Sequence, residues 1–177
     1  WNCGEGETVH DVLSRLGLNE EVTFEQLDPN GFDRMCLPGY DVKIPGSADE
    51  LVKRLCAVCA GDQHARVRRF VDRVHLVARG LAMVPSKVTV QSLILDGFAV
   101  LITANYIHAT LQNVFDEFDL PLPVQSILAP QWPDFLLPPE QLSLFAWVLL
   151  FTGYQRGAYY PTRHFEHVIE SLVQSIR

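Results

Sequence analysis

The stretch HARVRRFVDRVHLVARG, residues 64–80, decides the fold class of this 177-residue chain. Its apolar side chains recur every three or four residues, at Val67, Phe70, Val71, Val74, Val77 and Ala78. This spacing is typical of one buried face of an α-helix. Asp62 starts the pattern and Gly80 ends it, so the sequence predicts a helix over residues 62–80.

The residues before this stretch predict a second helix that packs beside it. Ser47 and Glu50 have the spacing of a capping box, and the helix that they open continues to Gly61. The short connection between the two segments predicts an antiparallel pair. A helical body is therefore expected from residue 47 onward.

Helical spacing also continues after the pair, from residue 86 to residue 118. A competing interpretation is a β-hairpin at Asp96-Gly97, because the residues on both sides of this turn are rich in β-formers. We favour two helices that are broken or bent at Gly97, since the helical period continues past the turn.

The last third of the chain combines a proline-rich segment with two helical patterns. Residues 119–139 are rich in proline but also apolar, so we expect an ordered irregular strap that packs on the body. The next segment, up to Gly153, is apolar nearly all round, which predicts a buried central helix. Thr162 is a good cap for a final helix.

The first 46 residues have a different pattern. Thr8 is the expected N-cap of a short amphipathic helix that ends at Gly17. A second short helix is expected over residues 24–27, followed by turns and by a strand over residues 40–44. The chain is thus predicted to be α+β, mainly α, with a small mixed module before a helical bundle-like body.

The order of these pieces resembles the LysM module. The usual LysM pattern is a G-D-T-L turn, a helix ending in glycine, an L-x-x-x-N-P segment and a closing L-x-P-G-x-x-L-x-I-P. The corresponding stretches are GETV at 6–9, the helix ending LG at 16–17, LDP at 27–29 and LPGYDVKIP at 37–45. The resemblance implies a strand–helix–helix–strand fold for residues 1–46 and a separate helical domain over 47–177. Departures from the pattern are Asp28 in place of asparagine, a first strand reduced to residues 1–3, and an unusually acidic segment.

The same resemblance implies a binding site for sugar. In the LysM family, sugar sits in a shallow groove between the loop before the first helix and the loop after the second. The matching positions are Gly6, Glu7, Thr8, Val9, Asp28, Pro29 and Asn30. The implied ligand is an N-acetylglucosamine polymer, peptidoglycan or chitin, whose N-acetyl groups suit the fixed backbone donors of tight turns.

Charge is distributed unevenly, although the net charge is −7. Residues 53–80 hold seven basic and two acidic groups, whereas residues 1–52 hold eleven carboxylates and three basic groups. Arg66, Arg69 and Arg73 share one helical face and are candidate contacts for an anionic partner. The favoured alternative is a solvated or internally paired face. The global basic footprint of a nucleic-acid-binding protein is absent.

Cysteine and histidine pairs favour structural roles. Cys56 and Cys59 lie at the end of the helix opened by Ser47, whereas a thioredoxin-like pair belongs at a helix N-terminus, and a zinc site would need two more ligands. His164 and His167 lie on the polar face of the last helix and lack H-E-x-x-H spacing. Nucleophile-elbow, Walker and dinucleotide-binding motifs are also absent. We therefore expect no enzyme activity, no metal and no cofactor.

The first functional hypothesis is a non-enzymatic scaffold that binds other proteins of a larger assembly. Aromatic enrichment at interfaces adds four candidate contact residues, Trp132, Tyr154, Tyr159 and Tyr160. A glycan-binding protein is the second hypothesis, and an enzyme with a site between the body and the strap is the third. The longest apolar run, residues 144–151, is too short to span a bilayer. We expect a soluble protein, either associated with the cell envelope or cytoplasmic.

Overall fold

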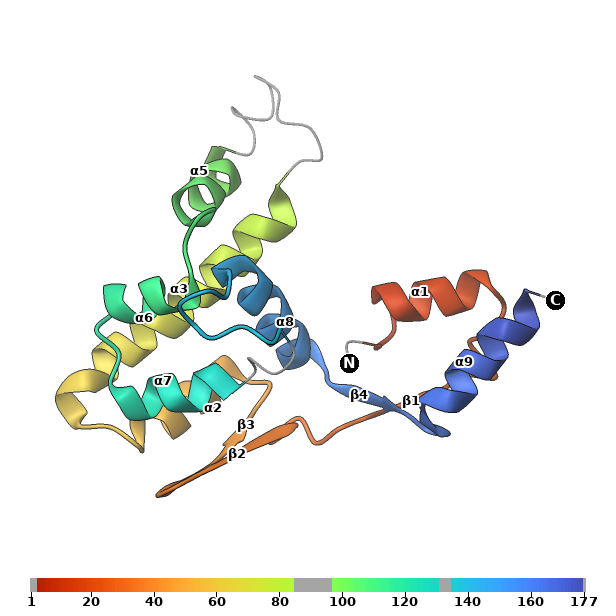
Figure 1. Cartoon of the computed structure of the whole chain (residues 1–177), viewed down its shortest axis with the longest axis horizontal. Coiled ribbons are helices and arrows are strands. Elements are labelled where there is room, and N and C mark those ends of the chain that lie inside the picture. The colour runs from red at the N-terminus through yellow and green to blue at the C-terminus, as the bar shows by residue number, and fades with distance from the viewer. Residues whose placement is uncertain (1–2, 85–96, 131–134, 177) are drawn as a thin grey trace. The chain divides into compact units, whose positions relative to one another are not determined.

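The computed structural model describes residues 3–84, 97–130 and 135–176. These residues form eight α-helices, one short 3₁₀-helix and two small antiparallel sheets (Figure 1). The α+β, mainly α class predicted from the sequence is confirmed. Contacts divide the chain into two compact units. Unit 1 comprises Trp1–Arg34, Lys43–Ser47 and Gly153–Arg177, and unit 2 comprises Met35–Val42 and Ala48–Thr152.

The first helix of unit 1, α1 (Thr8–Arg15), ends where the sequence predicts. Gly17 has a φ of +72°, and its amide donates to the Ser14 carbonyl at 3.1 Å. The Leu18 amide donates to the Leu13 carbonyl at 2.9 Å, which completes a Schellman end. The N-cap prediction was one residue off, because the N-cap residue is Glu7 and it makes no side-chain capping bond.

The prediction of a helix over residues 24–27 was wrong. This segment contains strand β1 (Phe24–Gln26), which pairs antiparallel with β4 (Tyr159–Pro161). Next to the ladder, the Thr23 and Thr162 hydroxyls are 2.7 Å apart. A helix of one turn is marginal in water, whereas the strand gains hydrogen bonds to a partner that lies far along the chain.

The C-terminal helix α9 (His164–Ser175) packs in unit 1. Its Val168 and Leu172 contact a small buried cluster of Leu13, Leu18 and Val22. The Ser171 hydroxyl donates to the Glu21 carboxylate at 2.7 Å. Residues 153–177 therefore group with α1, although the sequence prediction placed them in the helical domain. The helix begins later than the predicted Thr162 cap, whose hydroxyl also donates to the Thr23 carbonyl at 3.2 Å.

A hairpin of β2 (Asp33–Leu37) and β3 (Tyr40–Ile44) turns at Gly39, whose φ is +83°. The strand predicted over residues 40–44 is confirmed, and its Val42 and Ile44 are buried in alternation. Residues 3–46 thus contain one helix, one strand and one hairpin, in that order. This order differs from the strand–helix–helix–strand order that the LysM resemblance implies.

Unit 2 is built on α3 (His64–Met83), which packs with α2 (Ala48–Cys56) and the 3₁₀-helix η1 (Gly61–Gln63). Five of the predicted apolar positions of α3 are buried, namely Val67, Phe70, Val71, Val74 and Val77. The predicted stop at Gly80 was wrong, because the helix continues through it. A Cβ on Gly80 would lie 3.1 Å from the Ile102 Cγ2, so this glycine permits close helix packing.

Four more helices complete unit 2 and its boundary: α5 (Gly97–Tyr106), α6 (Leu111–Glu117), α7 (Leu122–Leu128) and α8 (Leu144–Arg156). Helix α5 excludes the hairpin alternative for the residues after Gly97, while residues 85–96 lie outside the described part of the chain. Helix α7 corrects the prediction of an irregular strap. Pro121 is its N-cap and Pro123 lies in its first turn, where a missing amide costs no hydrogen bond.

The core of unit 2 is aromatic. The Phe70 ring lies 5.7 Å from Phe115, 6.0 Å from Phe118 and 6.2 Å from Trp147, measured between centroids. Trp147 is fully buried on α8, and its indole N–H donates to the Leu128 carbonyl at 3.3 Å. The predicted central, buried helix is confirmed. Within the described residues, no helix has both the length and the apolar character needed to cross a membrane.

Candidate protein-docking surface

A hollow of about 490 Å³ lies on the side of α3 that faces away from its buried valines. Five of its lining residues lie on one side of α3, one is the last residue of α6, and one follows α6. They are Arg69, Asp72, Arg73, Leu76 and Arg79, with Glu117 and Phe118. The sequence predicts the shared face of Arg69 and Arg73. Glu117 and Phe118 could not be assigned to it, because nothing local in the sequence shows that α6 packs there.

Arg73, one of the lining residues of the hollow, is held in place by several contacts. Its guanidinium donates to the Tyr106 hydroxyl and, at 3.4 Å, to the Glu117 carboxylate. The same guanidinium lies over the Tyr106 and Phe118 rings, 5.8 and 5.5 Å from their centroids. Such cation–π contacts add to the hydrogen bonds. Arg73 is therefore oriented by groups from α5 and α6 and by the residue that follows α6.

Tyr106 connects three helices through its hydroxyl. The hydroxyl accepts from Arg73 and donates to Glu117, whose two oxygens each lie 3.2 Å away. Burial raises the pKa of Tyr106, the Arg73 hydrogen bond lowers it, and the Glu117 charge raises it again. The phenol is thus neutral at pH 7, which is the protonation state that donates to a carboxylate.

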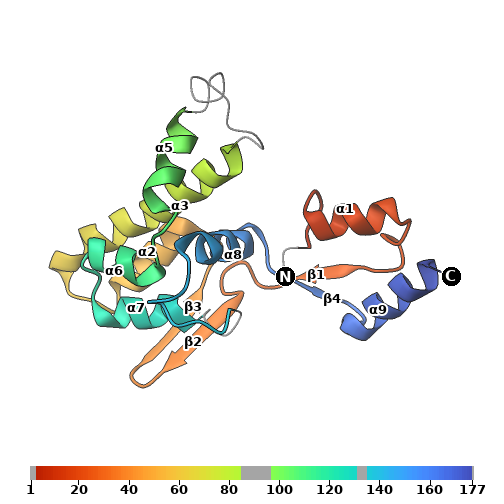
Figure 2. The same cartoon turned by 45° about the horizontal axis from the view of Figure 1, so that its top comes forward.

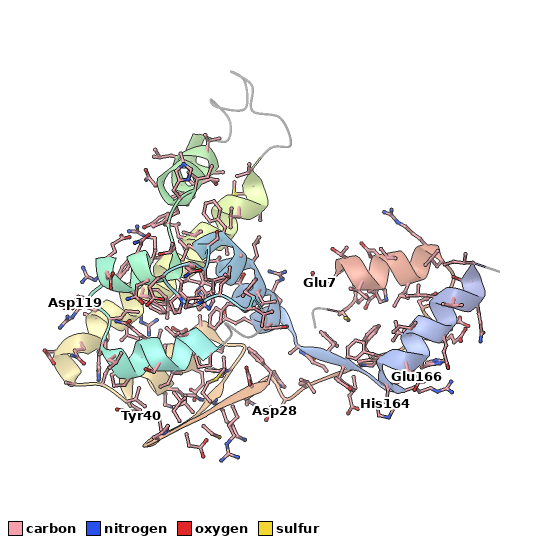
Figure 3. The ribbon with its side chains drawn as sticks, viewed as in Figure 1. Glu7, Asp28, Tyr40, Asp119, His164 and Glu166 are labelled. Atoms are coloured by element: carbon pink, nitrogen blue, oxygen red, sulfur yellow. The ribbon has the colours of Figure 1, made fainter. Side chains whose placement is uncertain are left out.

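Arg66 is directed elsewhere, although it shares the helix face. It pairs with the Asp119 carboxylate and donates to the Asp119 carbonyl at 3.1 Å. A second carboxylate, that of Asp62, lies 3.9 Å away. Figure 3 shows Asp119 beside the end of α6. Of the three arginines proposed from the sequence, only Arg69 and Arg73 line the hollow.

Two arginines of the hollow are available to a ligand. Arg69 and Arg79 are both exposed, and neither has a hydrogen bond or ion pair within residues 3–84, 97–130 and 135–176. Exposed, unpaired guanidinium groups can donate two parallel hydrogen bonds to a carboxylate. Arg79 is one of the seven basic residues in 53–80, but the sequence did not predict it as a contact residue.

Helix α5, which packs beside α3, has an apolar surface. This helix contains no charged residue, and its sequence is GFAVLITANY. Only Ala99 and Tyr106 are buried, whereas Phe98 is 51% and Leu101 60% exposed. Figure 2 shows α5 beside the C-terminal part of α3. Met83, which ends α3, is 55% exposed. We call Met83, Phe98 and Leu101 the apolar patch.

The hollow and α5 share contacts on α3. Gly80, the neighbour of Arg79, meets Ile102 and the Ala99 carbonyl of α5. About two helical turns before Gly80, Arg73 donates a hydrogen bond to Tyr106, the last residue of α5. Helix α5 therefore runs along α3 between these points. The arginines and the outer face of α5 lie on adjoining parts of unit 2.

The residues that the LysM resemblance implies for sugar binding belong to unit 1. Asp28 closes a tight turn, in which its carboxylate accepts from the Asn30 amide at 2.9 Å. Glu7 pairs with Arg156 at 3.1 Å. Figure 3 shows Glu7 and Asp28 at separate places rather than facing each other. Among the backbone–backbone hydrogen bonds of the described residues, none joins the Gly6–Val9 and Asp28–Asn30 segments.

The aromatic contact candidates also belong to unit 1, apart from Trp132, which lies outside the described residues. Tyr159 is packed against two glycines. A Cβ on Gly4 would lie 2.8 Å from the Tyr159 hydroxyl, and a Cβ on Gly157 would lie 2.6 Å from the Tyr159 ring. Tyr154 lies 6.1 Å from the Phe32 ring. Only Tyr160 is exposed, at 46%, and it packs edge-on against Phe165. All three of these tyrosines thus have packing contacts within unit 1.

The cysteine and histidine pairs show no reactive arrangement. Burial raises the pKa of the Cys56 and Cys59 thiols, which is opposite to what a thiolate nucleophile needs. His167 lies 3.1 Å from the Glu21 carbonyl, and His164 and Glu166 are near the start of α9 (Figure 3). Among the described residues, no three His, Cys, Asp or Glu side chains are grouped so that they could hold a metal ion.

Comparison with known proteins adds no assignment. No protein-family model, no curated protein and no solved structure matches the chain. The LysM resemblance therefore stays a prediction.

Proposed function

We propose that this chain is a non-catalytic scaffold that docks a partner protein on the apolar patch of α3 and α5. The observation that carries the proposal is the exposure of Phe98 and Leu101 on a helix without a single charge. A helix that is apolar on all sides is normally buried. Helix α5 has only one of its sides covered by α3.

Helix α8 provides the comparison within the same chain. It is also largely apolar, but it buries Leu144, Trp147 and Val148 at 1% exposure or less. Among the described residues, α8 thus buries these three large apolar side chains and exposes Leu149 (55%), whereas the buried residues of α5 are Ala99 and Tyr106. Adjacent exposed apolar side chains of this kind mark protein interaction surfaces.

The energetics favour a partner that brings its own apolar side chains. Completing the burial of a half-exposed phenylalanine, leucine or methionine contributes roughly 1 kcal/mol for each side chain. A patch of three such residues supplies an anchor of the kind found at the centre of protein interfaces. The apolar face of an amphipathic helix is a partner surface that complements such a patch.

The test places a charge on the patch. Leu101→Glu should reduce cross-linking to partner proteins in the native cells by about tenfold or more, because a buried, unpaired carboxylate is costly. Leu122→Glu is the matched control, since Leu122 is 73% exposed on α7 of the same unit. Circular dichroism and fluorescence of both variants should match the parent chain.

The outcome is read from the set of proteins captured. Loss of the same partners with Leu101→Glu, and their retention with Leu122→Glu, supports docking on α5. Equal capture by the two variants contradicts it. Retention of the chain on insoluble peptidoglycan or chitin, abolished by Thr8→Ala or Asp28→Ala, would support the glycan hypothesis instead.

A further inference from the structure

Two of the three arginines that line the hollow have no hydrogen-bond or ion-pair partner among the described residues. Arg73 is engaged by Tyr106 and Glu117, which fix its guanidinium. Arg69 and Arg79 extend from the same side of α3 without a partner among the described residues. Leu76 and Phe118 supply an apolar part of the lining.

The charge balance of the hollow indicates the class of anion. Three guanidinium groups face two carboxylates, those of Asp72 and Glu117, which leaves one net positive charge. A single carboxylate neutralises this charge. The apolar lining also suits the methylene groups of an aspartate or glutamate side chain.

We propose that the hollow receives an acidic side chain of the partner, which pairs with one of the exposed guanidinium groups, Arg69 or Arg79, while the partner's apolar residues cover α5. This inference rests on the proposed function and names the chemistry of its partner, which is a helix with apolar residues followed by aspartate or glutamate. The whole chain carries a net charge of −7 and repels acidic ligands at long range. The hollow therefore acts as a local filter that selects where such a partner docks.

The experiment uses the full chain and two short probes, N-acetyl-tetraglutamate and N-acetyl-tetraglutamine. Binding is followed by nuclear magnetic resonance through the arginine Nε–Hε signals at low ionic strength. We expect tetraglutamate to shift the signals of Arg69 and Arg79 and tetraglutamine to leave them unchanged. The double variant Arg69→Gln, Arg79→Gln should weaken tetraglutamate binding about tenfold.

The controls separate charge from position. The double variant Arg15→Gln, Arg163→Gln removes the same charge from unit 1 and should leave tetraglutamate binding within about twofold of the parent chain. Leu101→Glu tests the apolar patch and should not prevent the Arg69 shift, so failure of the docking proposal and failure of this inference give different results.

Three results would overturn the inference. One is equal binding of tetraglutamate and tetraglutamine. Another is tetraglutamate binding that is unchanged by the Arg69 and Arg79 substitutions. The third is tighter binding of inorganic phosphate than of tetraglutamate at the same signals, which would assign the hollow to a phosphorylated ligand.

Discussion

At the residue scale, Asp119 shows how one ion pair supports an uncommon backbone conformation. Asp119 follows α6 with a φ of +45°, and the Leu120 amide donates to the Phe115 carbonyl at 3.0 Å, as in a Schellman end. Glycine is the usual residue at such a position. Here, Arg66 binds both the carboxylate and the carbonyl of Asp119.

This arrangement predicts different effects on stability for two substitutions at one site. Asp119→Ala should lower the free energy of unfolding of unit 2 by about 1–2 kcal/mol, because alanine keeps the left-handed strain and loses the ion pair. Asp119→Gly should change it by less than about 0.5 kcal/mol, because relief of strain offsets the lost pair. Urea unfolding followed by fluorescence measures both. Equal destabilisation by alanine and glycine would contradict this account of the backbone strain.

At the element scale, Tyr106 joins α3, α5 and α6 through one hydroxyl. Tyr106→Phe should lower the free energy of unfolding by about 1 kcal/mol at pH 7, since it removes hydrogen bonds to two charged groups. The variant should also loosen α5, which would appear as faster amide exchange in residues 99–106. Tyr160→Phe is the control, because Tyr160 is 46% exposed.

The same tyrosine predicts a dependence on pH. Burial is the main reason that the pKa of Tyr106 is raised in the folded chain. As the pH rises past about 10, the unfolded chain therefore loses this proton before the folded chain does. The stabilisation is complete below that pH and is lost as the pH approaches the folded pKa. Urea titrations from pH 8 to 11 should show a steeper decline for the parent chain than for Tyr106→Phe. Parallel declines would rule out this role for Tyr106.

Elements whose cause is local could be predicted from the sequence. Gly17 ends α1, and the alternation of residues 40–44 forms β3, as expected. Two of the errors have distant causes. Residues 24–26 form a strand because β4 pairs with them, and Gly80 continues a helix because Ile102 packs on it. For the same reason, the sequence predicted only part of the candidate site. Helical spacing places Arg69 with Arg73, but Glu117 and Tyr106 reach them only through packing.

At the scale of the whole molecule, the division into units gives a prediction that differs from the module expected over residues 1–46. In unit 1, the cluster of Leu13, Leu18 and Val22 is closed by Val168 and Leu172 from α9. Strand β1 has its partner in β4. If these contacts stabilise the N-terminal segment, that segment requires the C-terminal one in order to fold.

Truncation after Arg156 tests this requirement. Removal of residues 157–177 should abolish the exchange protection of the Leu18 and Val22 amides, because it deletes both β4 and α9. Protection in α3 should persist, since the aromatic cluster of Phe70, Phe115 and Trp147 is left intact. Removal of residues 176–177 alone is the control, because Ile176 is 84% exposed. Continued protection of α1 in the long truncation would instead show that residues 1–46 fold independently, as the LysM resemblance implies.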